Sequence, residues 1–390
     1  MLQVTDMTNR RNFLGAAAAS LSLAANRKPR VACLMNVWFP NSHADVFVPR
    51  LLDGYRLDHA WNAPRLDTVA LYVDQFPHND MAREVAEEHR IPIYRTIGEA
   101  LRLGGKALAV DAVAVVGEHG DYPRTPRGNY MYPRRRYFDE IADAMKQAGR
   151  VVPVFHDKYF AYDWADAKSI YDRVREMRIP FLCGSTVPLA WRRPALDLPR
   201  ATPITEILAT SYSDLEEHAY HAIESLQAVA ERRPGGETGV ERVRHARGEE
   251  VWDLARRGEW SRDLLDAALS RRVNHVPNGS QEPEALLIRY RDGLKASILH
   301  VNAMTRDYIV ATRINGRAEI AASCFYIQLH VHNHWSFMVR AFENLALTQR
   351  NPNPIERTLT ANGIMLAGLE SRRRRGAWVE TPEISVSYLS

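Results

Sequence analysis

The chain has 390 residues, of which 46% are hydrophobic and 25% are charged. This is the composition of an ordinary globular protein, and it excludes a disordered or collagen-like chain. The length predicts two domains. The net charge is only +4 and the basic residues are scattered, which argues against a dedicated nucleic-acid-binding protein. The cysteines, Cys33, Cys183 and Cys324, lie far apart, which indicates buried thiols rather than a disulfide framework or a thiolate zinc site.

The first 28 residues have the features of a targeting segment. A twin arginine, Arg10-Arg11, precedes Asn12-Phe13-Leu14 and an Ala-rich apolar stretch over 16–25. This stretch is too short to span a bilayer, and nothing later in the chain reaches that length. The pattern resembles a twin-arginine export signal, which predicts a periplasmic or secreted protein without a membrane anchor. The alternative is an ordinary N-terminal tail on a cytoplasmic protein.

Short apolar strands alternate with amphipathic helices in the first half of the chain. The strands are expected at 30–35, 69–73, 112–116, 151–155 and 179–183, and the helices at 80–89, 136–148 and 164–178. This alternation predicts βαβ units on a doubly wound parallel sheet. An insertion at 51–65 is expected to cover the cleft beside that sheet.

The loop after the first strand departs from the usual nucleotide-binding pattern. Dinucleotide-binding folds place G-x-G-x-x-G here, so that the pyrophosphate meets backbone N–H groups at a helix N-terminus. Residues 35–43 contain no glycine; Val37 is branched at Cβ, and Pro40 lacks an N–H group. Asp74 ends the second strand, where an acid would bind the ribose hydroxyls.

Loops that follow the first, third and fourth strands each contain histidine and carboxylate side chains. Strand C-termini are where ligands bind in open α/β sheets, so these loops could also supply metal ligands. The candidate ligands are His43, Asp45, His119, Asp121, His156 and Asp157. Polar surface loops are the alternative, and the sequence favours no metal.

The second half reads as a meandering sheet with one strong helix. Strands are expected at 206–209, 285–290, 295–301, 308–313 and 318–329, with an Asn315-Gly316 turn, and a helix at 215–232. Glu217 and His221 are four residues apart on that helix, a spacing that lets a carboxylate orient a general acid/base histidine. A solvated ion pair is the alternative. The segment His330-Val331-His332-Asn333-His334 alternates as a strand would, with three imidazoles on one face.

Together these segments resemble the Gfo/Idh/MocA oxidoreductases over nearly the whole chain after the signal. The family loop G-x-G-x-x-G-x-x-H-A aligns with 35–44, which keeps His43-Ala44 and has lost all three glycines. The family segment A-G-K…E-K-P resembles Ala148-Gly149-Arg150…Asp157-Lys158-Tyr159, and D-x-G-x-H resembles 217–221. Residues 191–194 are similar to an R-x-x-P-like stretch, and 342–382 to a final helix and strand that pack back on the sheet.

The resemblance implies an α/β fold with a Rossmann-like domain at 29–190 and a second domain at 191–390. The second domain would be α+β, with an open, mostly antiparallel sheet that binds substrate and forms homodimers or homotetramers. The implied activity is hydride transfer between tightly held NAD or NADP and a hydroxyl group of a sugar, cyclitol or glycoside. Tight retention would suit an exported enzyme, since no nicotinamide pool exists outside the cell.

The resemblance also implies roles for particular residues. His221 would be the base, Glu217 its orienting acid and Lys158 the cation that polarises the developing carbonyl oxygen. The expected cofactor-binding residues are Asn36, Trp38, His43, Asp74, Glu118 and Asp157. The expected substrate-binding residues are Arg192, His119 and Tyr122. Two alternatives remain open: a redox-neutral, metal-dependent lyase, hydrolase or isomerase in the same cleft, and a non-catalytic sugar-binding protein.

Overall fold

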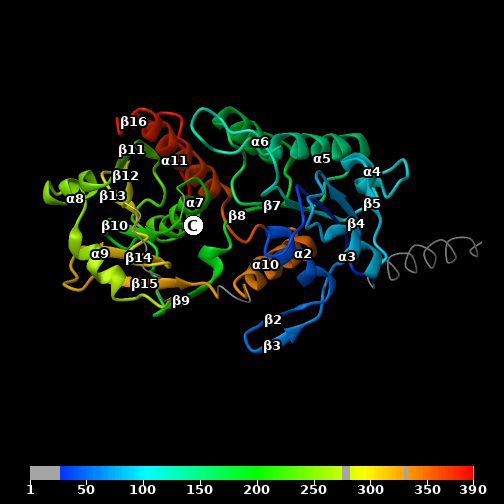
Figure 1. Cartoon of the computed structure of the whole chain (residues 1–390), viewed down its shortest axis with the longest axis horizontal. Helices are drawn as coiled ribbons and strands as arrows, with labels where there is room; N and C mark the ends of the chain where they lie inside the picture. Colours follow the sequence, from blue (N-terminus) through cyan, green and yellow to red (C-terminus); the bar gives the residue numbers. More distant parts are fainter. Residues whose placement is uncertain (1–26, 214, 275–281, 329–331, 390) are drawn as a thin grey trace, which may run out of the picture.

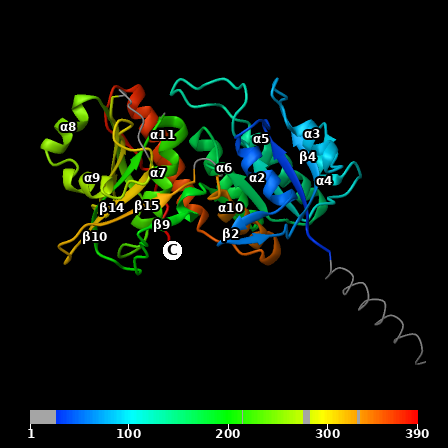
Figure 2. The ribbon, with the colours of Figure 1, turned by 60° about the horizontal axis from the view of Figure 1, so that its bottom comes forward.

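The structure is a computed structural model that describes residues 27–213, 215–274, 282–328 and 332–389. Its elements form two lobes that lie side by side, one built on a parallel sheet and the other on a mostly antiparallel sheet (Figure 1). The lobes remain distinct when the molecule is turned (Figure 2). Nearly all of the proposed export signal lies outside the described residues. Within the described part, no helix is long and apolar enough to cross a membrane.

The first sheet has six parallel strands in the order β5-β4-β1-β6-β7-β8. They are β1 (Arg30–Met35), β4 (Asp67–Val73), β5 (Ile93–Tyr94), β6 (Ala112–Val116), β7 (Val154–Asp157) and β8 (Phe181–Gly184). β1 is paired with β4 on one side and with β6 on the other, so the strand order reverses at β1. This is the order of a doubly wound dinucleotide-type domain, which confirms the predicted fold class.

Helices cover both faces of this sheet because its strands are apolar on both sides. In β1, Val31, Cys33 and Met35 pack into one core, while Ala32 and Leu34 pack into the other. The first face carries α2 (His43–Leu52), α3 (Ala82–Glu88) and α10 (Trp335–Thr348), and the second carries α4 (Ile97–Arg102), α5 (Arg134–Ala148) and α6 (Trp164–Met177).

The second sheet has eight strands in the order β16-β11-β12-β13-β10-β14-β15-β9. Only β10 and β13 are parallel; the other pairs are antiparallel. The strands are β9 (Trp191–Arg193), β10 (Ile204–Ser211), β11 (Val240–Arg247), β12 (Glu284–Tyr290), β13 (Lys295–His300), β14 (Tyr308–Ile314), β15 (Ala321–Tyr326) and β16 (Val379–Glu380). The mostly antiparallel sheet was predicted, but β11 was missed because charged side chains occupy half of its positions.

Two helix layers enclose the second sheet. α7 (Leu215–Ala230) and α11 (Ile355–Arg373) pack on one face, and α8 (Glu249–Arg256) and α9 (Arg262–Leu269) cover the other. β16 pairs with β11, so the final helix and strand do pack back on the sheet.

Two segments differ from expectation. α10 comes from the C-terminal half of the chain but packs in the core of the parallel-sheet lobe, where Trp335 and Phe342 lie against Phe47. The insertion at 51–65 forms a hairpin of β2 (Tyr55–Leu57) and β3 (Ala60–Asn62). It packs on α10 through a 2.7 Å hydrogen bond from Tyr55 to Glu343, and its residues do not line the cleft.

The histidine segment at 330–334 does not continue as a strand where it is described. His332 has a positive φ of 48°, and His334 occupies the N-cap position of α10 without a side-chain capping hydrogen bond. His330 lies outside the described residues. The alternation of histidine with other residues predicted a strand, but the same spacing is also compatible with a turn that leads into a helix.

Candidate active site

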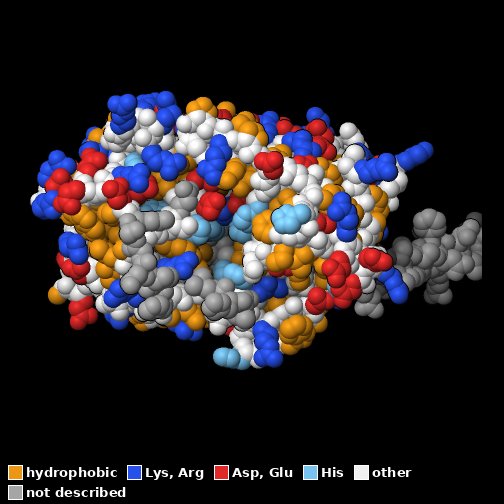
Figure 3. Space-filling view, in the orientation of Figure 1, with side chains coloured by type: hydrophobic (Ala, Val, Ile, Leu, Met, Phe, Trp, Pro, Cys, Tyr) orange, Lys and Arg blue, Asp and Glu red, His pale blue; other side chains and the backbone are white. Residues whose placement is uncertain are grey.

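A cavity of about 160 Å³ lies between the two lobes. Its described lining is Asn41, His43, Val46, Thr186, Val187, Tyr212, His218, His221, Tyr308, Ile327, His332, His334 and Trp335. Five of these residues are histidines, and none carries a carboxylate, amine or guanidinium group. Figure 3 shows histidine side chains gathered in the hollow between the lobes. A cavity of this size holds about one six-membered ring.

Burial keeps three imidazoles of this cavity, those of His218, His221 and His334, neutral. Burial and the nearby positive charge of Lys158 lower the pKa of His218 to about 3. Burial and the neighbouring His332 lower the pKa of His334 to about 3. Burial and Lys158 also lower the pKa of His221 well below its ordinary value. A neutral imidazole donates one hydrogen bond and accepts another, so the walls can bind hydroxyl groups without adding charge.

His221 is held from the opposite lobe by Ser185. The Nδ1 atom of His221, on α7, lies 2.6 Å from the Oγ atom of Ser185, which directly follows β8. The Oγ atom of Ser185 also accepts a hydrogen bond of 3.0 Å from the backbone N–H of Val187. The Glu224 carboxylate, one turn along α7, accepts the backbone N–H of Ser185. Ser185 could not be predicted from the sequence, since a single serine after a strand carries no motif.

Gly184 allows α7 to approach β8 this closely. Its φ is +122°, and a Cβ atom there would lie 2.7 Å from Glu224 Oε2 and 2.9 Å from Thr358 Oγ1. A larger residue would be strained at this φ and would displace the Glu224 and Thr358 side chains that bind the end of β8. Glycine is therefore the residue that suits this junction between the lobes.

Lys158 belongs to a buried charge cluster behind the cavity wall. Its Nζ atom lies 2.7 Å from Glu118 Oε2, and Glu118 also pairs with the fully buried Arg134. Burial disfavours the Glu118 anion, but Lys158 and Arg134 outweigh that effect and lower its pKa to about 2. Burial likewise disfavours the Lys158 cation, and Glu118 outweighs it, so the pKa of Lys158 is raised. Lys158 thus stays charged close to His221 but is not among the described lining residues.

Glu217 does not have the orienting role expected for it. Its side chain is exposed, whereas His221 is buried and held by Ser185. Only the backbone carbonyl of Glu217 contributes, as the acceptor of a 3.4 Å hydrogen bond from Lys158. The adjacent Glu216 points inward instead and accepts a 3.2 Å hydrogen bond from the Tyr159 hydroxyl. Burial, together with Glu118, raises the pKa of Glu216 to about 7.

Three of the expected polar residues meet near the start of α2. His43 lines the cavity, and its Nδ1 atom lies 2.6 Å from Asp157 Oδ2. The His119 ring packs edge-on against His43, with 5.3 Å between ring centroids. Burial and His43 lower the pKa of His119 to about 4. His119 was expected to bind substrate, but it lies beside the described cavity lining rather than in it.

In the loop before α2, where a dinucleotide pyrophosphate would bind, two backbone N–H groups already donate to nearby side chains of the same segment. The backbone N–H of Asn41 donates to Asp45 Oδ2 at 2.8 Å, and that of Phe39 donates to Ser42 Oγ at 3.2 Å. Asp45 also places a negative charge in the first turn of α2, where it would repel a phosphate. Trp38, expected to bind the cofactor, is instead fully buried in the core of this lobe.

The expected ribose-binding acid is also engaged. Asp74 accepts hydrogen bonds from Tyr72 at 2.5 Å, from Tyr122 at 2.7 Å and from Arg136 at 2.6 Å. Burial opposes its ionisation, but these donors outweigh burial and lower the pKa of Asp74. Tyr122, expected to contact substrate, thus binds Asp74 instead. In the described conformation, the residues at the ribose and pyrophosphate positions do not fit a bound dinucleotide.

Arg192, the remaining expected substrate residue, also has a structural partner. On β9 it lies over the Phe325 ring, and its guanidinium donates to the Leu196 carbonyl at 2.6 Å. It is not among the described residues that line the cavity.

The alternative metal ligands do not all come together. His156 is buried in β7 with its ring 6.1 Å from Phe181, and Asp121 is exposed. Among the described residues, no group of three or more His, Cys, Asp and Glu side chains is placed to hold a metal ion.

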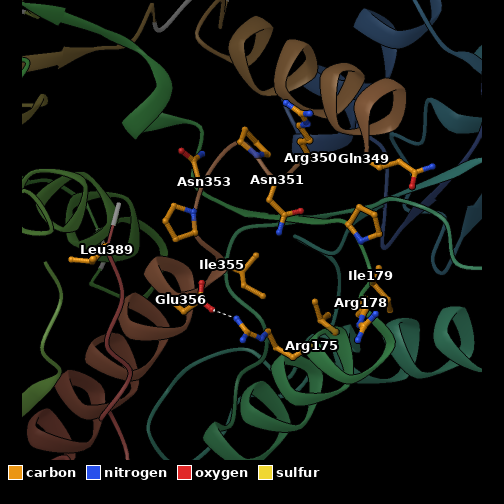
Figure 4. Close-up of a pocket in the computed structure, with 14 residues that line it drawn as sticks. Arg175, Arg178, Ile179, Gln349, Arg350, Asn351, Asn353, Ile355, Glu356 and Leu389 are labelled. Carbon is orange, nitrogen blue, oxygen red and sulfur yellow. Dashed lines mark hydrogen bonds and ion pairs between the residues drawn. The ribbon is translucent and has the colours of Figure 1, made fainter.

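A larger hollow of about 770 Å³ lies at the other end of β8, near the start of this strand (Figure 4). It lies between the end of α6 and the segment before α11, and Arg175 pairs there with Glu356 at 2.8 Å. None of the sequence-predicted site residues lines it.

No family model matches the chain, and no curated protein sequence matches it. Solved structures do match. Scyllo-inositol dehydrogenase from Lactobacillus casei, solved with bound NAD(H) and scyllo-inositol, is 12% identical with a TM-score of 0.55. The match covers 91% of this chain and 99% of that chain. Myo-inositol 2-dehydrogenase from Lactobacillus plantarum is 11% identical with a TM-score of 0.56, over 91% and 99% of the two chains.

A third match is UDP-N-acetylglucosamine 3-dehydrogenase from Acidithiobacillus ferrooxidans. It is 13% identical with a TM-score of 0.51, and the match covers 89% of this chain and 98% of that chain. At such identities the likeness lies in the fold. The chain therefore has the two-domain fold of these inositol and sugar dehydrogenases, which is the fold that its resemblance to the Gfo/Idh/MocA oxidoreductases predicted.

Proposed function

We propose that the chain is an oxidoreductase that transfers a hydride between NAD(P) and a hydroxyl-bearing carbon of an uncharged, single-ring sugar or cyclitol. The fold supports this proposal, since its solved neighbours include an inositol dehydrogenase with bound NAD(H) and scyllo-inositol. The observation that carries it is the cavity itself. His221 from one lobe and His43 from the other face the same space of about 160 Å³.

The cavity walls favour a neutral polyol. The neutral imidazoles of His218, His221 and His334 offer donors and acceptors for hydroxyl groups, as do Asn41, Thr186 and Tyr308. Trp335 adds an aromatic surface for ring C–H groups. No described lining residue carries a charge that would balance a carboxylate or a phosphate. The expected substrates are therefore inositols and simple hexoses rather than their phosphates or uronic acids.

His221 is suited to be the base. When its Nδ1–H donates to Ser185, its Nε2 atom keeps a lone pair that can take the proton of a substrate hydroxyl. The low pKa of His221 keeps this lone pair available at neutral pH. Lys158 acts through its charge, which disfavours the imidazolium before substrate binds and stabilises an alkoxide that develops nearby. When bound, NAD(P) supplies the hydride acceptor.

Asp74 already binds Tyr122, and Asn41 in the loop before α2 already donates to Asp45. These contacts favour a second candidate function, which needs no dinucleotide. This is a redox-neutral lyase, hydrolase or isomerase that uses His221 on the same class of substrate. It would consume the polyol without forming reduced nicotinamide.

The test combines two measurements on the purified protein. One follows reduced nicotinamide when NAD⁺ or NADP⁺ is supplied with scyllo-inositol, myo-inositol or glucose, and the other determines the mass of any nucleotide released by denaturation. We expect oxidation of at least one uncharged polyol and none of inositol phosphate or glucuronate. Polyol loss without nicotinamide reduction would establish the second candidate, and loss of neither would contradict both.

We also propose that the protein is exported in its folded state. The support is the twin arginine before an apolar segment, since that pathway carries folded proteins. The homodimer or homotetramer stays a prediction. Because α8 and α9 cover the outer face of the second sheet, any pairing would use another surface.

A further inference from the structure

Residues 119–131, between β6 and α5, cross the C-terminal ends of β1 and β4. We call this segment the strap. The side chain of Asn36, which follows β1, donates a 3.1 Å hydrogen bond to the His119 carbonyl. Gln75, which follows β4, makes two hydrogen bonds with the backbone of Asp121, at 3.0 and 2.8 Å. These strand ends are where a doubly wound domain binds the ribose and pyrophosphate of a dinucleotide.

Tyr122 and Gly120 fix the strap against this edge. The Tyr122 hydroxyl donates to Asp74 at 2.7 Å and so takes an acceptor that a ribose hydroxyl would otherwise use. Gly120 has a φ of +106°, and a Cβ atom there would lie 2.6 Å from the Tyr122 ring and 3.1 Å from Gln75 Oε1. A residue larger than glycine at position 120 would therefore collide with the Tyr122 ring and with Gln75.

We infer that the strap occupies the ribose and pyrophosphate positions of the groove and must be displaced before NAD(P) can bind. With the strap in place, the protein keeps its polyol cavity but excludes nucleotide from solution. When the strap is displaced, Asp74 and the loop before α2 become exposed. The inference rests on the proposed function for the identity of the nucleotide. It accounts for a Rossmann-type sheet that has lost its glycine loop, since strap groups and not phosphate oxygens contact this edge of the sheet.

The experiment measures NADH and NADPH association with the full chain by stopped-flow fluorescence. It compares the wild type with a double variant, Gln75→Ala with Tyr122→Phe, which removes three hydrogen bonds of the strap and leaves Asp74 in place. Tyr130→Phe is the matched control, because that hydroxyl pairs with Arg124 within the strap and does not touch Asp74. Each lost hydrogen bond is expected to favour opening, so the double variant should associate at least about tenfold faster. The control should match the wild type.

The rate of backbone hydrogen exchange in the strap gives a second test, because nucleotide binding is expected to change it in the direction opposite to the usual one. Ligands ordinarily slow exchange where they bind, whereas nucleotide binding here should speed exchange of residues 119–131, because the strap moves away from the ends of β1 and β4. Equal association rates for all three proteins, or slower exchange of the strap on binding, would overturn the inference. Failure of every protein to bind nucleotide would also overturn it, since the strap would not be what excludes the ligand.

The outcomes separate this inference from the proposed function. Fast nucleotide binding by the wild type with polyol oxidation would refute the strap and leave the oxidoreductase standing. Fast binding by the double variant alone, without oxidation of any polyol, would support the strap and refute the oxidoreductase.

Discussion

Ser185 and His221 come from different lobes and meet at 2.6 Å between Oγ and Nδ1. The contact fixes the imidazole ring at the junction where the parallel sheet ends and α7 begins. It takes the place of the carboxylate–histidine pair that the sequence pattern suggested. The orientation of the base therefore depends on how the two lobes pack and not on a neighbour along its own helix.

Replacing Ser185 by Ala should lower kcat about 10- to 100-fold with little change in KM, since a misoriented base loses part of its contribution. Steady-state kinetics would show the split. Ser225→Ala is the matched control, because this buried serine binds the backbone carbonyl of His221 at 2.8 Å and not its ring. An equal loss in both variants would mean that Ser185 acts only through stability.

Substitutions of His221 and of Glu217 should differ sharply in their effect on turnover. His221→Asn should lower turnover by about 10²- to 10⁴-fold, the contribution of a positioned acid/base group. Glu217→Gln should stay within about twofold of wild type, because its side chain is exposed and only its backbone carbonyl serves the site. His245→Asn, which removes a buried histidine paired with Glu284 in the second lobe, controls for general packing effects. Comparable losses of turnover in the Glu217 and His221 variants would instead support the hypothesis that the Glu217 carboxylate orients His221.

Buried histidines in and beside the cavity should make the protein sensitive to acid. The folded pKa values of His119, His218 and His334 lie below the unfolded value near 6.5, at about 4, 3 and 3. The unfolded state therefore binds more protons below pH 6.5. The stabilisation is complete above that pH and is lost as pH falls toward 3, at up to about 1.4 kcal/mol per pH unit for each imidazole. Urea unfolding from pH 7.5 to pH 4 measures this slope, which His218→Gln should reduce; an unchanged slope would contradict the assignment.

Glu118 should matter more to stability than either of its cations. Glu118→Gln leaves Lys158 and Arg134 buried together without a balancing charge, and should lower the free energy of unfolding by about 3–5 kcal/mol. Lys158→Met should cost less, because Glu118 keeps Arg134 as its partner. Chemical denaturation of both variants gives the order. The reverse order would show that Lys158 and not Glu118 holds the cluster together.

Export should depend on the twin arginine. The double variant Arg10→Lys with Arg11→Lys should remain in the cytoplasm and still fold, because a receptor reads the pair. Cell fractionation with a thermal unfolding curve on the retained protein tests both parts. Unchanged export would remove the signal and favour an ordinary N-terminal tail.

Local patterns were enough for the fold class. Buried runs such as 112–116 and the helical periods between them indicated a parallel sheet with two helix layers, because apolar periodicity is a local property. The resemblance to the Gfo/Idh/MocA motifs also indicated Lys158 and His221, which the structure places near each other from separate lobes. Neither inference needed contacts between distant residues.

The remaining features depended on contacts that no local pattern encodes. Adjacent residues on a helix differ by about 100° in direction, so the packing of α7 decided that Glu216 points inward while Glu217 faces solvent. Ser185 could be recognised only once β8 lay against α7. The strap residue Tyr122 and the acid Asp74 are 48 positions apart, and they meet because β4 and β6 end at the same edge of one sheet. Sequence determined the elements and the chemical groups they carry, whereas tertiary packing decided which of those groups reach the cavity, because direction and distance between elements are set by the whole core.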